Sequence, residues 1–217
     1  MDRETFGPLN NKHYASYVKD IAASGYHLLS IINDILDLAK AEANKLTLEE
    51  REVDLVQLAR ESIRMCEPKA GQNGIKIVLR ACADQVIARA DGKLVLQILL
   101  NLVSNAVKFS HHGREVDVTI SVSDRSVLIR VRDEGIGIPA ADVERVLRPF
   151  EQVENSLTRQ HSGTGLGLPY AVKLAELHGG ALWIESQVNV GTSVTVALPR
   201  DRFIAVRQAP EDLRVAI

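Results

Sequence analysis

The stretch from Asp91 to Ser110, DGKLVLQILLNLVSNAVKFS, predicts a buried helix that constrains the fold of the whole chain. Asp91 can cap this helix, and most of the residues after it are good helix formers. Apolar side chains cover most of its circumference, which is typical of a helix that packs on a sheet. Asn101, Asn105 and Lys108 break this pattern, and their i, i+4 and i+7 spacing places them on one face.

This polar stripe has two interpretations. Two amides and an ammonium group on an otherwise apolar helix are costly to bury unless they bind something polar. An amide oxygen is a suitable ligand for Mg²⁺, and a lysine is suited to phosphate. A stripe that faces solvent explains the same spacing equally well, so the helix alone does not decide between binding and exposure.

Composition narrows the class of protein. The chain has 217 residues, enough for one full domain and an appendage, and its 46% apolar and 25% charged residues are typical of a globular protein. A net charge of −2 and an aromatic content of 4% argue against a nucleic-acid partner. No apolar run is long enough to span a membrane, no signal-peptide pattern is present, and Cys66 and Cys82 have neither metal nor redox spacing. We therefore expect a cytoplasmic chain that makes no membrane contact of its own.

Residues 12–44 predict a long helix with an apolar seam. The seam residues recur at alternating spacings of four and three, as in a helical bundle: Tyr14, Val18, Ile21, Gly25, Leu28, Ile32, Ile35 and Ala39. Leu29, Ile31, Leu36 and Leu38 add a second strip, which a single helix cannot bury by itself. We favour a bundle through which the chain forms a homodimer, and the alternative is a helix packed on its own domain.

A compact pattern of alternating strands and helices follows the long helix. Strands are predicted at 46–53, 75–79, 86–90, 116–122, 127–133, 182–186 and 192–198, and helices at 54–66, shortly after Pro139 and at 165–178. Residues 153–163 are polar and lack periodicity, which predicts a mobile loop, and no strong pattern follows Pro199. The chain thus divides into a helical segment at 1–45, a domain at 46–200 and a tail at 201–217.

Asp133 continues the inward-facing, odd-numbered set of the strand from Val127 to Val131, so its carboxylate should point to the core. A buried carboxylate needs a hydrogen-bond donor, and an exocyclic amine such as that of adenine would supply one. Gly135 and Gly137 follow, and their missing side chains would let a ligand approach the backbone. The alternative is an aspartate that caps a turn between a strand and a helix.

A glycine-rich run, GTGLGL from Gly163 to Leu168, opens a predicted helix. The N–H groups at such a helix start can bind phosphate oxygens. The run matches neither a P-loop nor the GxGxxG fingerprint, and a flexible hinge explains it equally well.

Taken together, four motifs are specific. In chain order they are NLVSNAVKFS, DEGIGIP (Asp133 to Pro139), RPFEQVE (Arg148 to Glu154) and GTGLGL. They closely resemble the N, G1, F and G2 boxes of sensor histidine kinases, which belong to an ATPase superfamily with gyrase and MutL-type proteins. The resemblance implies an α/β (α+β) two-layer sandwich of the Bergerat type, with a mixed sheet and a pocket for ATP between helices.

The resemblance also implies roles for individual residues. Asn105 matches the magnesium ligand, Asn101 lies by the triphosphate as a second metal contact, and Asn101 and Lys108 take the catalytic roles. Asp133 matches the residue that reads the adenine amine, Phe150 and the loop after it match the ATP lid, and Arg159 matches a phosphate contact. The other implied cofactor-binding residues are Lys108, Phe109, Gly135, Gly137, Gly163, Thr164, Gly165, Leu166 and Gly167.

Residues 25–49 resemble the second helix of the dimerisation and phosphotransfer hairpin of this family, and the first helix, with its acceptor histidine, is absent. That acceptor is followed by an acidic residue, whereas none of the histidines here is: His13, His27, His111, His112, His161 and His178. We expect His27 to lie on a helix surface, and His178 to lie in a last helical turn where a cation suits the dipole. The other histidines lack metal-ligand spacing.

The resemblance predicts the ATP-binding catalytic region of a two-component sensor histidine kinase. With ATP and Mg²⁺, the kinase would transfer the γ-phosphoryl group to a histidine for relay to the receiver domain of a response regulator. The chain is either free in the cytoplasm or part of a membrane-anchored kinase. Two alternatives remain: a partner-switching serine kinase, against which the hairpin-like helix argues, and a nucleotide-binding module that docks a response regulator without catalysis.

Overall fold

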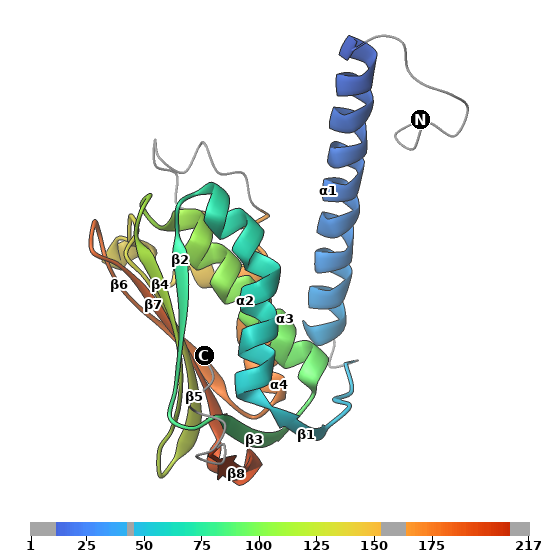
Figure 1. Ribbon diagram of the computed structural model, residues 1–217. Helices are drawn as coiled ribbons and strands as arrows, with labels where there is room; N and C mark the ends of the chain where they lie inside the picture. The colour runs from blue at the N-terminus through green and yellow to red at the C-terminus, as the bar shows by residue number, and fades with distance from the viewer. Residues whose placement is uncertain (1–11, 43–45, 153–163, 209–217) are drawn as a thin grey trace.

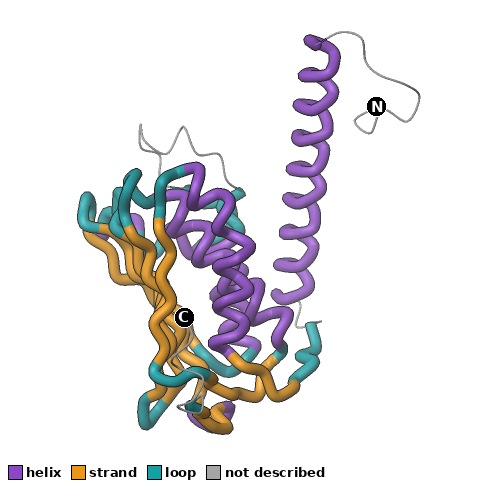
Figure 2. Tube along the Cα trace, viewed as in Figure 1, coloured by secondary structure: helices purple, strands orange, loops and turns teal. Residues whose placement is uncertain are grey.

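The computed structural model describes residues 12–42, 46–152 and 164–208. Its α-helices are α1 (Lys12–Glu42), α2 (Leu55–Gln72), α3 (Gly92–Phe109) and α4 (Gly167–Leu177). Figure 1 shows α2, α3 and α4 together on one side of a sheet, while α1 projects away from this α/β unit. In Figure 2 the helical layer and the strand layer are separate, so the α/β unit is a two-layer sandwich, as predicted.

The main sheet has five strands in the order β2-β4-β5-β7-β6, and a smaller sheet has the order β1-β3-β8. The bounds are β1 Arg51–Asp54, β2 Lys76–Ala81, β3 Gln85–Ala90, β4 Glu115–Val122, β5 Ser126–Asp133, β6 Ala181–Gln187, β7 Gly191–Pro199 and β8 Phe203–Arg207. The β2–β4 pair is parallel and the other pairs are antiparallel. The main sheet is therefore mixed, as the resemblance implied.

Buried apolar side chains alternate with less buried ones along β4 and β5, and the buried set forms the sheet side of the core. Val118 of β4 lies opposite Val131 of β5, and Ile120 lies opposite Ile129. All of these side chains are buried, as are Leu99, Leu102 and Val103 of α3. The apolar face of α3 therefore packs on the sheet, as its sequence predicts.

Two aspartates cap helices in the predicted way. Asp54 Oδ1 accepts a hydrogen bond from the Val56 N–H at 3.0 Å, and Asp91 Oδ1 accepts from Lys93 N–H at 3.0 Å and Leu94 N–H at 3.3 Å. Each carboxylate satisfies backbone donors that a helix start leaves without partners.

Several predicted boundaries were wrong. The strand predicted at 46–53 is regular only from Arg51 to Asp54, where it pairs with β3. The helix α2 passes Pro68 and ends at Gln72, because its apolar face continues to the buried Ala70. The helix expected after Pro139 is instead two 3₁₀ turns, Ala140–Asp142 and Arg145–Leu147.

The strand β8 was not predicted, because its five residues show only weak alternation. It pairs with β3 from Gln85 to Ala88, across more than one hundred positions of sequence. The segment after Pro199 is thus partly a strand of the smaller sheet. The loop predicted as mobile at 153–163 and the end of the tail, 209–217, lie outside the described residues.

The apolar seam of α1 remains largely exposed. Tyr14, Ile21, Leu28 and Ile32 are all exposed, Ile21 to 72%. The C-terminal end of α1, where Ala41 is buried, meets the α/β unit, and α1 contacts α4 (Figure 1). A helix packed along its own domain is therefore not what the structure shows, and dimerisation through the seam stays a prediction. None of the helices described is both long and apolar enough to cross a bilayer.

Candidate functional site

A pocket opens between α3, the end of β5, the start of β7, the loop at 136–138 and the start of α4. Its polar contributors are Asn105, Lys108, Asp133, Gln152 and Thr192. The remaining lining residues are mostly apolar: Leu102, Ala106, Phe109, Val131, Ile136, Gly137, Ile138, Val146, Leu168 and Val194. An apolar cavity with a few converging polar groups is typical of a site for a small organic ligand.

Asp133 lies at the end of β5 and is 7% exposed, so its predicted inward orientation is confirmed. Its Oδ1 accepts hydrogen bonds from the N–H groups of Gly135 at 2.9 Å and Thr192 at 3.3 Å. No donor from the described residues reaches Oδ2. Burial raises the pKa of Asp133 to about 6, although the two N–H groups and nearby Arg132 favour the charged form. The carboxylate therefore presents an acceptor to a pocket that is otherwise largely apolar.

Asn101 and Asn105 of the α3 polar stripe face the start of α4. A Cβ atom added to Gly167 would lie 3.6 Å from Asn101 Oδ1 and 3.8 Å from Asn105 Nδ2. All three stripe residues are partly buried. The Nδ2 of Asn101 is buried without a hydrogen-bond partner among the described residues. An unpaired buried amide is costly, so the stripe has the features of a binding surface rather than of an exposed helix face.

Lys108 lies where positive charge is concentrated. Its Nζ lies 4.7 Å from the centroid of the Phe109 ring. Burial lowers the pKa of Lys108, and the positive charge of Lys69 on α2 lowers it further. Two cations near one pocket favour an anionic ligand. Sequence reasoning missed Lys69, because its proximity comes from the packing of α2 on α3.

At the start of α4, Gly167 and Leu168 carry backbone N–H groups and are only partly buried, whereas Pro169 has no N–H group. Leu166 is the N-cap residue of α4 and provides no side-chain cap, while Thr164 Oγ1 accepts a hydrogen bond from the Leu166 N–H at 3.2 Å. Leu166 is fully buried and its N–H group is already paired, so it offers no group to a ligand. The helix start therefore has the geometry expected of an anion-binding terminus.

Close contact with neighbouring backbone explains why Gly135 and Gly137 have no room for a side chain. A Cβ at Gly135 would lie 2.0 Å from the Phe109 carbonyl oxygen, and one at Gly137 would lie 2.0 Å from the Gln187 carbonyl oxygen. The space that both glycines leave is thus filled by neighbouring backbone, and the approach of a ligand to their backbone stays a prediction. Gly137, with φ of 66°, still lines the pocket through its backbone.

The pocket gathers some predicted site residues and not others. Asn105, Lys108, Phe109, Asp133 and Gly137 line it. Those described outside its lining are Asn101, Gly135, Phe150, Thr164, Gly165, Leu166 and Gly167. Phe150 is 63% exposed and has φ of 65°, beside Gly165 with φ of 70°. Arg159 and Gly163 lie outside the described residues.

Sequence reasoning also missed Thr192, whose N–H group orients Asp133 and which lies 59 positions further along the chain. The only local signal was the Gly191-Thr192 pair at the start of a predicted strand.

His178 corrects another prediction. It is fully buried at the end of α4. Burial lowers the pKa of His178, and the positive charge of Arg202 lowers it further. His178 is therefore neutral rather than a cation that interacts with the helix dipole. The side chains of His13, His27 and His161 lie outside what the structure describes. Within the described ranges, no group of three or more His, Cys, Asp and Glu side chains could hold a metal ion.

Comparison with solved structures identifies the fold. The crystal structure of full-length ShkA in complex with AMPPNP matches with a TM-score of 0.78 at 31% identity, over 92% of this chain and 41% of that one. The catalytic domain of the histidine kinase ThkA matches with a TM-score of 0.61 at 25% identity, over 70% of this chain and 97% of that one. The α/β sandwich is therefore the Bergerat-type fold of histidine kinase catalytic domains.

Residues 90–202, more than half of the chain, match the family model of histidine kinase-, DNA gyrase B- and HSP90-like ATPases. The chain belongs to this ATPase family.

A relative is the circadian input-output histidine kinase CikA of Synechococcus elongatus, which is 40% identical over 204 residues, 93% of this chain and 27% of CikA. Another is the histidine protein kinase DivJ of Caulobacter vibrioides, 39% identical over 199 residues, 92% of this chain and 33% of DivJ. The chain thus spans a third or less of the length of these relatives.

Proposed function

We propose that this chain is the ATP-binding catalytic region of a sensor histidine kinase. The observation that carries the proposal is Asp133, buried at the end of an apolar pocket with one carboxylate oxygen open to it, in a member of this ATPase family. The exocyclic amine of adenine would donate to Oδ2. The apolar side chains of Leu102, Val131 and Val194 would contact the two faces of the base.

The triphosphate would lie between the α3 stripe and the start of α4. The ammonium group of Lys108 would pair with a phosphate oxygen, and Lys69 would add positive potential. The Gly167 and Leu168 N–H groups at the start of α4 would donate to a second phosphate oxygen. These groups hold and orient the nucleotide, and positioning is the main contribution of a protein to phosphoryl transfer.

The residues present fit a magnesium ion that is bound together with the nucleotide. Asn101 places its Oδ1 and Asn105 its Nδ2 toward Gly167, so Asn101 would offer an oxygen ligand as it stands and Asn105 would do so with its amide rotated by 180°. The unpaired Asn101 Nδ2 is a donor, which would suit a phosphate oxygen of the same nucleotide. Magnesium keeps several water and phosphate ligands, so it needs no cluster of carboxylates from the protein. When bound, the ion would neutralise charge that develops on the phosphates.

In the complete protein, the γ-phosphoryl group would pass to a histidine on an acceptor hairpin and then to the receiver domain of a response regulator. The exposed seam of α1 would form a homodimer with a second copy, which would bring the acceptor close to the nucleotide. We place the protein in the cytoplasm or on the cytoplasmic side of a membrane anchor. The similarity to proteins named as histidine kinases favours this function over a serine kinase.

Phosphorylation in trans tests the proposal. The chain would be mixed with a separately produced acceptor hairpin from a related histidine kinase, γ-labelled ATP and magnesium. We expect acid-labile, alkali-stable label on the hairpin, with none when its histidine is replaced by glutamine. If ATP binds and no hairpin is labelled, the chain is a nucleotide-binding interaction module; if ATP does not bind, the proposal is wrong.

A further inference from the structure

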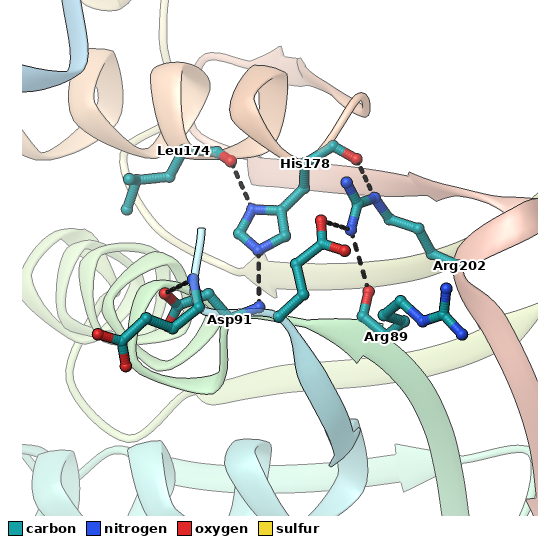
Figure 3. Close-up of polar contacts among 7 residues, drawn as sticks. Arg89, Asp91, Leu174, His178 and Arg202 are labelled. Carbon is teal, nitrogen blue, oxygen red and sulfur yellow. Dashed lines mark hydrogen bonds and ion pairs between the residues drawn. The ribbon is translucent and has the colours of Figure 1, made fainter. Parts of the chain in front are cut away.

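A network of hydrogen bonds joins the start of α3 to the end of α4 (Figure 3). His178 lies at its centre, with Nδ1 2.8 Å from the Leu174 carbonyl oxygen and Nε2 3.1 Å from the Asp91 backbone nitrogen. A carbonyl oxygen only accepts and an N–H group only donates, so Nδ1 carries the proton and Nε2 is the bare acceptor. The two contacts therefore select one neutral tautomer.

Asp91 connects three segments of the chain. Its Oδ1 caps α3 through the N–H groups of Lys93 and Leu94, and its own N–H donates to His178. Its Oδ2 accepts from the Glu49 N–H at 3.0 Å. Since Glu49 belongs to the segment between α1 and β1, this one residue fixes that segment, α3 and α4 relative to one another.

Arg202 joins the same network from the C-terminal side. Its Nε donates to the His178 carbonyl oxygen, and its Nη1 donates to Glu50 Oε1 at 2.7 Å and to the Arg89 carbonyl oxygen at 3.1 Å. The end of α4 is thereby held by both the backbone and the ring of His178. Figure 3 shows Arg202 and Asp91 approaching His178 from different elements.

The helices α3 and α4, joined by this network, flank the proposed nucleotide site further along α3 and at the start of α4. Asn101 lies ten residues, about 15 Å, beyond Asp91 along α3, and Gly167 lies eleven residues, about 17 Å, before His178 along α4. At that level the helices approach closely, with a Cβ at Gly167 3.6 Å from Asn101 Oδ1. A change in the angle between the helices at the network would therefore change the spacing between the α3 stripe and the start of α4.

We infer that His178 is a positioning residue for the nucleotide site: by holding Asp91 against the end of α4, it sets the spacing between the α3 stripe and Gly167. The inference rests on the proposed ATP binding. His178 is not among the residues that line the pocket, and it acts through the two helices. Its buried hydrogen bond with the Asp91 N–H resists relative motion of α3 and α4, because breaking that bond would leave a buried donor and a buried acceptor unpaired.

The experiment compares two amide substitutions that keep different contacts. In His178→Gln, the amide oxygen can take the place of Nε2 and keep the Asp91 contact, whereas in His178→Asn the shorter amide can keep only the Leu174 contact. Both substitutions place a neutral amide at the same buried position. Titration calorimetry with magnesium and a non-hydrolysable ATP analogue would measure affinity. The temperature would be well below the unfolding temperatures of both His178 variants. We expect about fivefold or greater loss for His178→Asn and less than about twofold for His178→Gln, since one net hydrogen bond is worth roughly this factor.

A matched control separates positioning from stability. Val127→Ala removes buried volume at the end of β5 that lies away from Asp133, so it should lower the unfolding temperature and leave affinity unchanged. Equal affinity of the two His178 variants, or losses that follow the unfolding temperatures of all three variants, would overturn the inference. If the unmodified chain does not bind the analogue, the proposed function itself is wrong. If it binds and the affinity does not depend on the His178 contacts, only the positioning role is refuted.

Discussion

Replacement of Asp133 by asparagine should weaken adenine binding and at the same time stabilise the free protein. Asparagine keeps an oxygen that can accept from the Gly135 and Thr192 N–H groups. Its amide nitrogen would take the place of Oδ2, so a donor would face the adenine amine. A hydrogen bond to a charged group contributes roughly 1.5–3 kcal/mol, which predicts a loss of about 10- to 150-fold in affinity for ATP.

The stability change follows from the pKa of Asp133, which burial raises from 3.8 to about 6. Because the folded-state pKa is above the unfolded value, the charged carboxylate costs stability fully above about pH 6, and the cost disappears as the pH falls towards 4. A shift of about two units corresponds to about 3 kcal/mol. The free energy of unfolding of Asp133→Asn should therefore exceed that of the native chain by up to about 3 kcal/mol at pH 7 to 8, and the difference should shrink towards pH 4.

Calorimetric titrations with a non-hydrolysable ATP analogue and with tripolyphosphate, both with magnesium, would measure the effect on binding. ATP affinity of the native chain should also fall below about pH 6, where Asp133 becomes protonated, and Asp133→Asn should lack this dependence. Glu134→Gln is a matched control, since Glu134 is an exposed neighbouring carboxylate paired with Arg114. An equal loss for ATP and tripolyphosphate would refute the assignment of Asp133 to the base.

Three further predictions test other parts of the structure. Asn105→Ala should abolish the magnesium-dependent part of ATP affinity and leave the fold intact, as titrations with magnesium or EDTA would show; unchanged affinity in magnesium would contradict the metal assignment. Gly135→Ala should destabilise the domain by about 1–3 kcal/mol, because the added Cβ meets the Phe109 carbonyl oxygen, whereas Gly71→Ala, with open space in α2, should stabilise it by roughly 0.5–1 kcal/mol; chemical denaturation compares the two, and equal effects would argue against the close backbone contact. The chain alone, incubated with γ-labelled ATP, should acquire no acid-labile label, since none of its histidines is followed by a carboxylate; stoichiometric label on any histidine would show that it contains its own acceptor.

The features that sequence predicts well here are those whose physical cause is local. Asp54 and Asp91 cap the helices that begin immediately after them. The inward orientation of Asp133 follows from the parity of one strand, and it is buried as predicted. In each case the signal lies within a few residues of the side chain that it describes.

The features that were missed depend on contacts between distant segments. The strand β8 gains its structure only by pairing with β3, and Lys69 approaches Lys108 only because α2 packs on α3. Gly135 and Gly137 were correctly recognised as special positions, but the backbone that fills their missing side chains comes from Phe109 and Gln187. Sequence could therefore identify a constrained position without identifying what constrains it.

His178 shows why this distinction matters for chemistry as well as for geometry. A histidine in the last turn of an isolated helix would gain from being protonated, because its charge interacts favourably with the helix dipole. In the folded chain the same ring meets the N–H of Asp91, which lies 87 positions earlier, and a second proton on the ring would replace that hydrogen bond with a contact between two donors. The distant partner thus reverses the protonation state that the local sequence favours. It also links the residue that caps α3 to the helix that faces the α3 stripe, so the contact that corrects the prediction is the one through which His178 can act on the nucleotide site.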